Sequence, residues 1–158
     1  MKNPIQYKQI VDHGIRAAGC IILLLLICVC GWESHASADC ADIKITTKQQ
    51  VVSKGDTVYV MVTVTSTTAM SGFEGFFTYD NTVLQFQTGG SVVYGNDDAF
   101  QISDIDRSST ATKLKYSIKF KARKAGDTEI ALTGPYHVFG ESTSTKLSAS
   151  YNSLVLVV

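Results

Sequence analysis

A two-residue alternation runs along much of this chain, and it limits the fold to one built from β-strands. The clearest example is KLKYSIKFKAR, residues 113–123, in which apolar side chains alternate with Lys, Ser and Arg. Because successive side chains of a strand point to opposite sides, one side of this segment is core and the other is a basic strip. DTVYVMVTVT, residues 56–65, places four valines on one side in the same way.

Seven further segments have the alternation or composition of short strands. They are residues 42–46, 72–80, 84–86, 99–105, 128–134, 145–150 and 153–158. Turn residues such as Gly, Asn and Asp separate them, and no stretch after residue 38 keeps a helical period. Nine short strands at this spacing predict an all-β fold, a β-sandwich.

The first 38 residues have a different composition. Lys2, Lys8 and Arg16 are followed by an apolar run containing CIILLLLICVC, and then by Ala36-Ser37-Ala38. This order is typical of a secretory signal peptide and predicts cleavage after Ala38. An uncleaved N-terminal anchor is the alternative, although the run is shorter than the roughly 20 apolar residues that cross a bilayer.

Cleavage leaves one domain, residues 39–158, in a protein that is secreted or held at the cell surface. Of the four cysteines only Cys40 remains, so no internal disulfide is predicted. A domain of about 120 residues buries roughly two-thirds of its chain surface and can fold on its core alone. The formal net charge of +0 argues against a nucleic-acid partner.

The sequence offers little catalytic chemistry. It contains no GxSxG, P-loop, HExxH or CxxC motif, and His137 is the one histidine well inside the predicted domain. A single strand histidine is more often structural than catalytic. We therefore predict that the chain is not an enzyme and needs no cofactor.

Acidic residues cluster twice, as Asp97-Asp98 and as Asp104-x-Asp106. Carboxylate oxygens are the ligands that Ca²⁺ prefers, so these four residues are the candidates for a calcium site. Adjacent loop acids are more often solvated turn residues, and the second cluster lacks the glycine of the EF-hand pattern. The sequence predicts no metal site beyond this possibility.

The basic strip and the aromatic residues each have two interpretations. The lysines of residues 113–123 form either a solvated or edge-protecting strand face, or a docking face for an acidic or hydroxyl-rich partner. Flat rings stack on sugars, and Tyr59, Phe76, Tyr94 and Tyr136 are the candidates for that role. Most of these rings alternate with core positions, so no planar aromatic platform is evident.

Three segments together resemble the cohesin modules of bacterial cellulosome scaffoldins. They are GDTV at 55–58, GFEGFFTYD at 72–80 with VLQF at 83–86, and IKFK at 118–121 with AGDT at 125–128. The resemblance covers residues 41–158, almost the whole predicted domain. Within it, Tyr79 is interpreted as a core residue and Asp80 as a turn residue that accepts backbone hydrogen bonds.

The resemblance implies a nine-stranded jelly-roll β-sandwich that binds without catalysing. Its expected partner is a dockerin module, which would tether secreted polysaccharide-degrading enzymes. The expected binding face combines outward residues of two strands: Gly72, Glu74, Phe76, Thr78, Lys115, Lys119 and Lys121. Two alternatives remain, a carbohydrate-binding module on the same fold, with a polysaccharide partner, and a structural or adhesive surface domain.

Overall fold

The computed structural model describes residues 40–105 and 110–158. The predicted signal peptide, its cleavage after Ala38 and the calcium candidate Asp106 lie outside the described residues. Within them there is no helix that is both long and apolar enough to cross a membrane. Cys40, at the start of the first strand, is an exposed free thiol.

The domain consists of β-strands joined by turns and loops. In chain order the strands are β1 (Cys40–Thr47), β2 (Thr57–Met70), β3 (Gly72–Thr78), β4 (Leu84–Thr88), β5 (Val93–Gly95), β6 (Ala99–Asp104), β7 (Ala111–Ala122), β8 (Asp127–Leu132), β9 (His137–Phe139), β10 (Lys146–Tyr151) and β11 (Leu154–Val157). All nine segments predicted as strands are confirmed. The two additional strands, β5 and β9, have three residues each, too few to show an alternation.

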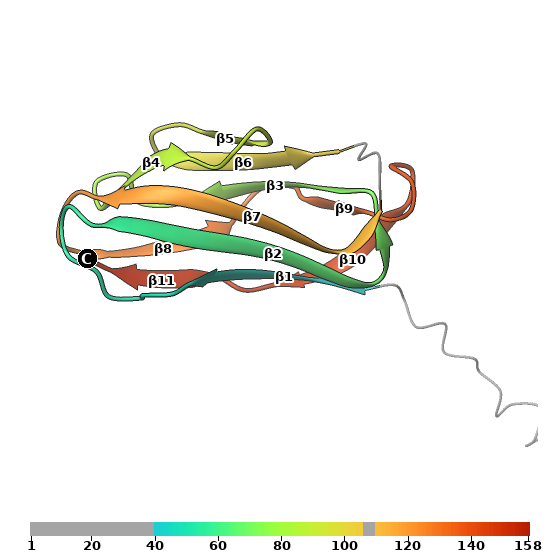
Figure 1. Ribbon diagram of the computed structural model, residues 1–158, viewed down its shortest axis with the longest axis horizontal. Coiled ribbons are helices and arrows are strands. Elements are labelled where there is room, and N and C mark those ends of the chain that lie inside the picture. Colours follow the sequence, from blue (N-terminus) through green and yellow to red (C-terminus); the bar gives the residue numbers. More distant parts are fainter. Residues whose placement is uncertain (1–39, 106–109) are drawn as a thin grey trace, which may run out of the picture. The chain divides into compact units, whose positions relative to one another are not determined.

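The strands form two layers that run lengthwise (Figure 1). One layer has the order β10-β1-β2-β7-β4, in which β1 and β10 are parallel. The other has β8 and β6 beside β3, with β11 and β5 at its margins. The short β9 pairs with both β3 and β10 and so connects the layers into one hydrogen-bonded path. This arrangement confirms the predicted all-β sandwich.

Aromatic rings fill the space between the layers. Phe73 of β3 lies 6.0 Å from Tyr116 of β7, measured between ring centroids. Phe100 of β6 similarly lies 5.9 Å from Phe120 of β7, edge to face. Since β3 and β6 are not hydrogen-bonded to β7, these contacts join opposite layers across the core. The outward side chains of the two layers therefore face away from each other.

Tyr79 and Asp80 form the corner at which the chain leaves β3 for β4. Tyr79 is 6% exposed, and its hydroxyl donates a 2.7 Å hydrogen bond to the Asn96 carbonyl. Burial raises the pKa of the Tyr79 hydroxyl, which keeps it protonated as a donor. The Asp80 carboxylate accepts a 2.8 Å hydrogen bond from the Thr82 backbone N–H. Both predictions for this pair, a core tyrosine and a turn aspartate, are confirmed.

Asn152, in the bend between β10 and β11, closes a gap beside β1. Its amide oxygen accepts a 2.8 Å hydrogen bond from the Ile45 N–H. Its amide nitrogen donates a 3.1 Å hydrogen bond to the Ile45 carbonyl. The pairing of β1 with β10 ends at Ile43. Beyond that point the Asn152 side chain makes the two hydrogen bonds that a neighbouring strand would make to Ile45.

Candidate functional site: two opposite sheet faces

The predicted partner residues of β3 follow the alternation of that strand. Phe76 and Thr78 are exposed and Glu74 is half-buried, whereas Phe73 and Phe77 are fully buried in the core. Gly72 is also buried, and a Cβ there would collide with the Asp104 carbonyl oxygen. Glu74, Phe76 and Thr78 therefore lie on an outer face, while Gly72 allows the close approach of two backbones.

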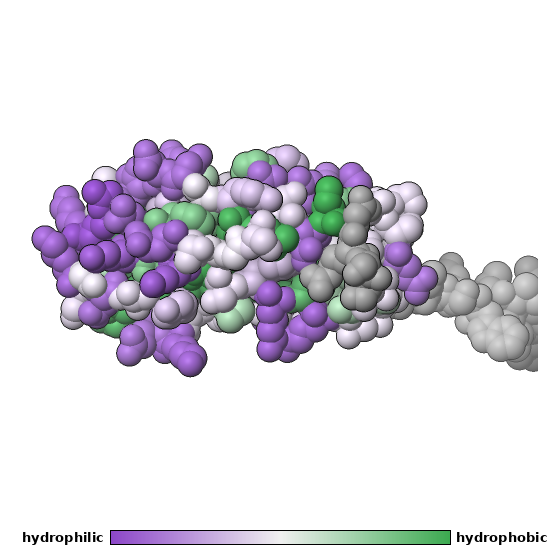
Figure 2. All heavy atoms as spheres, turned by 45° about the horizontal axis from the view of Figure 1, so that its top comes forward, coloured by the Kyte–Doolittle hydropathy of each residue, from purple (hydrophilic) through white to green (hydrophobic). Residues whose placement is uncertain are grey.

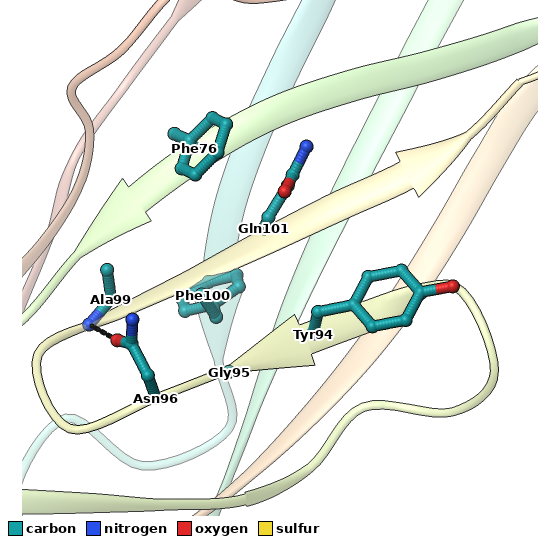
Figure 3. Close-up of a pocket in the computed structure, with 7 residues that line it drawn as sticks. All are labelled: Phe76, Tyr94, Gly95, Asn96, Ala99, Phe100 and Gln101. Carbon is teal, nitrogen blue, oxygen red and sulfur yellow. Dashed lines mark hydrogen bonds between the residues drawn. The ribbon is translucent and has the colours of Figure 1, made fainter.

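A row of three side chains crosses this outer face. Phe76 of β3 is in register with Gln101 of β6, which is in register with Tyr94 of β5. The rings are 41% and 60% exposed, respectively. Figure 3 shows Phe76 and Gln101 rising from neighbouring strands, with the Tyr94 ring beside β5. The Gln101 amide also donates a 3.2 Å hydrogen bond to the Glu74 carboxylate, which orients both side chains.

A shallow pocket of about 180 Å³ opens at this row (Figure 3). Phe76, Tyr94 and Gln101 form its rim, and the turn between β5 and β6 adds Asn96. The Asn96 side chain accepts a 3.0 Å hydrogen bond from the Ala99 N–H, so this turn is held in place. The pocket is large enough for a single partner side chain rather than for a small-molecule substrate, because ligand pockets span roughly 300–1,000 Å³.

Three acidic residues share the outer face with the row. Thr78 is in register with Ala131 of β8, which places the exposed Glu129 and Asp127 on the same outer side. Glu74 adds a third carboxylate from β3. We call this surface, with Glu74, Phe76, Tyr94, Asp127 and Glu129, the acidic face.

The lysines predicted to share this face lie on the opposite side of the domain. Lys115, Lys119 and Lys121 belong to β7, which pairs with β2 and β4 and not with β3. Their neighbours Tyr116 and Phe120 point into the core toward β3 and β6, so the lysines point away from it. The single face expected from the sequence is therefore two faces, and the structure does not bring the lysines near Glu74 or Phe76.

Hydrophilic residues are unevenly distributed on the surface. They crowd the end of the domain at the left of Figure 2, where β7 ends and β8 begins, and become sparser toward the middle. The turn at that end includes the exposed Arg123 and Lys124, directly after the lysines of β7. Positive charge thus continues from the strand into the turn.

The three calcium candidates that the structure describes, Asp97, Asp98 and Asp104, do not gather into a site. Asp97 and Asp98 precede β6 and Asp104 ends it, so about 17 Å of extended strand separates them. Asp104 instead accepts a 2.9 Å hydrogen bond from the Tyr116 hydroxyl. Within residues 40–105 and 110–158, no three His, Cys, Asp or Glu side chains are grouped to hold a metal ion.

The candidate sugar-stacking rings are divided between the two faces. Phe76 and Tyr94 lie on the acidic face, and Tyr59 of β2, 56% exposed, lies on the layer of β7. Tyr136 is half-buried, and its hydroxyl donates a 3.1 Å hydrogen bond to the Ala149 carbonyl. The four rings therefore form no common platform, although three of them are exposed.

Gln101 is not among the site residues that the sequence predicts. The alternation of AFQISDI could have placed Gln101 outward with Ala99 and Ser103, because Phe100 and Ile102 are buried. The neighbourhood of Gln101, however, depends on the pairing of β6 with β3 and β5. No local pattern specifies that pairing.

The arrangement of the strands in this domain is that of a known class of β-sandwich, the cohesin fold. The sixth cohesin of scaffoldin B from Acetivibrio cellulolyticus, solved in complex with a dockerin, superposes with a TM-score of 0.58 at 20% identity, over 75% of this chain and 98% of that one. A non-cellulosomal cohesin from the archaeon Archaeoglobus fulgidus gives 0.59 at 12% identity, over 74% and 89%. The seventh ScaB type I cohesin from Pseudobacteroides cellulosolvens gives 0.53 at 15% identity, over 75% and 91%.

These similarities are structural. No protein-family model matches the chain, and no curated protein matches it in sequence. At such low identities the comparison establishes the fold alone, so the function has to be inferred from the faces of the domain.

Proposed function

We propose that this domain is a non-catalytic binding module that docks a dockerin module on its acidic face. The observation that carries the proposal is the row of Phe76, Gln101 and Tyr94, two exposed rings bracketing an amide on a flat sheet. Support also comes from the shared fold with the Acetivibrio cellulolyticus cohesin that was solved with a dockerin.

The composition of the row suits a protein partner. Interface energy is concentrated in a few buried aromatic anchors near the centre of a contact, surrounded by polar groups that exclude water. Phe76 and Tyr94 provide the anchors and the pocket between them accepts one partner side chain. The Glu74–Gln101 pair holds its polar groups in place before binding, which lowers the ordering cost.

The charge of the face predicts the character of the partner. Glu74, Asp127 and Glu129 share the outer face with the aromatic row, and none of them forms an ion pair among the described residues. Complementary charge steers association and selects among partners more than it adds affinity. The docking surface of the dockerin should therefore carry lysines or arginines around an apolar centre.

The biological setting follows from the same resemblance. We infer that the chain is exported by the segment ending at Ala38 and works outside the cell, and that its partner belongs to a polysaccharide-degrading enzyme. A protease-accessibility and cell-fractionation assay of the tagged protein tests the location. Retention in the cytoplasm would contradict it.

Binding to a panel of dockerin-bearing proteins from the same proteome tests the partner. The protein is immobilised and each candidate is passed over it with calcium present. We expect saturable binding. Phe76→Ala should weaken it and Tyr59→Ala should leave it intact, because Phe76, unlike Tyr59, lies on the acidic face. Absence of binding across the panel, with the protein shown to be folded, would refute a dockerin partner.

A further inference from the structure

Five lysines share the outer surface of the layer opposite the acidic face. Lys113, Lys115, Lys119 and Lys121 are the outward lysines of β7, and Lys44 comes from β1. Together with Tyr59 these residues form what we call the basic face. The basic face also contains the acidic residue Asp42, whose carboxylate lies 2.9 Å from the Lys44 ammonium group. This is the only ion pair among residues 40–105 and 110–158.

The structure removes two ordinary explanations for Lys119 and Lys121 of β7. Lysines protect the open edge of a sheet, but at these two residues β7 is paired with β2 on one side and β4 on the other. Neighbouring acids could neutralise them, but the cross-strand partners of Lys119 are Tyr59 and Thr88, and those of Lys121 are Thr57 and Gln85. Neither of these two lysines has an acidic cross-strand partner.

A hollow adjoins the basic face at Tyr59. It has a volume of about 380 Å³ and is lined by Thr47, Lys48, Gln49, Val52, Thr57, Val58 and Tyr59. Its polar groups are hydroxyls, an amide and an ammonium group, and its ring is 56% exposed. The hollow continues directly into the lysines, because Tyr59 is in register with Lys119 and Thr57 with Lys121.

We propose that the basic face and this hollow form a second binding site, which takes a linear polysaccharide bearing carboxylate groups. The Tyr59 ring stacks on one sugar, with Gln49 and Thr57 available to its hydroxyls. Lys48, Lys119 and Lys121 pair with carboxylates on that sugar and its neighbours through charge-assisted hydrogen bonds. Further carboxylates along the chain reach Lys115 and Lys113 on the same flat strand face.

The lining favours a sugar chain over an acidic peptide. A peptide recognised by charge alone needs the lysines but not an exposed ring set among hydroxyl and amide groups. Lys119 is also half-buried between Tyr59 and Thr88, so its stem is fixed beside the ring where a sugar would stack. Ring and charge are thus presented together at one position.

Titration of the protein with polygalacturonate at low salt tests the site. Saturable binding is expected, and Lys119→Gln with Lys121→Gln should weaken it roughly tenfold, since two exposed ion pairs are lost. Tyr59→Ala should weaken it about fivefold through loss of ring contact. Lys146→Gln and Tyr94→Ala make the same chemical changes outside the basic face and should leave binding unchanged.

Two comparison polymers identify the recognised chemistry. Fully methyl-esterified polygalacturonate has the same sugar backbone without charge, and poly-L-glutamate has carboxylates without sugar. Both should bind much more weakly, and the effect of Tyr59→Ala should be confined to the sugar polymer. Equal binding of poly-L-glutamate, with Tyr59→Ala silent, would overturn the proposal in favour of an acidic peptide, and no binding of polygalacturonate would overturn it outright.

Discussion

The two outer faces of this sandwich are built by the same rule and have opposite character. On each face every second residue of a strand is outward, and the intervening residues form the common core. The acidic face combines Glu74 and Glu129 with two exposed rings, whereas the basic face combines five lysines with one. A net charge of +0 therefore conceals a strongly polarised molecule. Two partners bound to opposite faces would not compete for the same surface.

The largest effect should come from the core that the faces share. Phe73 is fully buried and its ring lies 6.4 Å from that of Phe77 and 6.0 Å from that of Tyr116. Phe73→Ala should lower the free energy of unfolding by about 3–5 kcal/mol, because a large cavity forms between the layers. Denaturant-induced unfolding measures the loss. Phe76→Ala on the same strand is the control, and equal losses for both would contradict the assignment of inward and outward sides.

The next effect separates the faces by their aromatic residues. Phe76→Ala should weaken dockerin binding at least tenfold without a comparable loss of stability, because central aromatic anchors contribute about 2 kcal/mol or more. Titration calorimetry with the dockerin found in the panel measures it. Tyr59→Ala is the matched change on the basic face. An equal loss with Tyr59→Ala would show that the two faces do not act separately.

A smaller effect separates the faces by charge. Glu74→Lys should slow association with a dockerin several-fold, most strongly at low salt, because charges at the edge of an interface mainly affect the association rate. Lys119→Glu, on the opposite face, should leave that rate unchanged. Stopped-flow or surface-binding kinetics at two salt concentrations decide the matter. A slower rate with Lys119→Glu alone would place the dockerin on the basic face.

The smallest effect concerns the corner that joins one layer to the other. Hydrogen bonds from the Thr82 side chain, and then from its backbone N–H, lower the pKa of the Asp80 carboxyl. The folded state therefore favours the charged carboxylate. That stabilisation is present above the unfolded pKa of about 4 and is lost as pH falls through the lower folded pKa. Asp80→Asn keeps a hydrogen-bond acceptor but cannot titrate. Between pH 5 and 3, roughly the range of linkage, the unfolding midpoint of this variant should therefore fall slightly less than that of the wild type.

The sequence predicted which side chains are outward but not which of them share a face. Alternation is a local property of one strand, and it correctly separated Phe76 from Phe77 and Lys119 from Phe120. Face sharing depends on strand pairing, which joins residues far apart in the chain. The sequence predicted one face for the β7 lysines and Glu74, and the pairing of β7 with β2 and β4 separates them.

The row at the candidate site shows the same limit. Phe76 was identified because GFEGFFTYD resembles a cohesin segment, and its outward position was confirmed. Gln101 and Tyr94 join it only through the pairing of β6 with β3 and β5. Since β5 has three residues, its alternation is too short to be recognised, and Tyr94 could be suggested only as an isolated ring.

The Asn152 side chain has a consequence for the behaviour of the protein in concentrated solution. An unpaired strand backbone is a template on which another molecule can add a strand, and repeated addition leads to fibrils. At Ile45 both backbone groups are already occupied by one carboxamide. Because a side chain blocks this stretch and cannot itself extend a sheet, growth from β1 is terminated at that residue. The Asn152 carboxamide thus protects this stretch of β1 against strand addition.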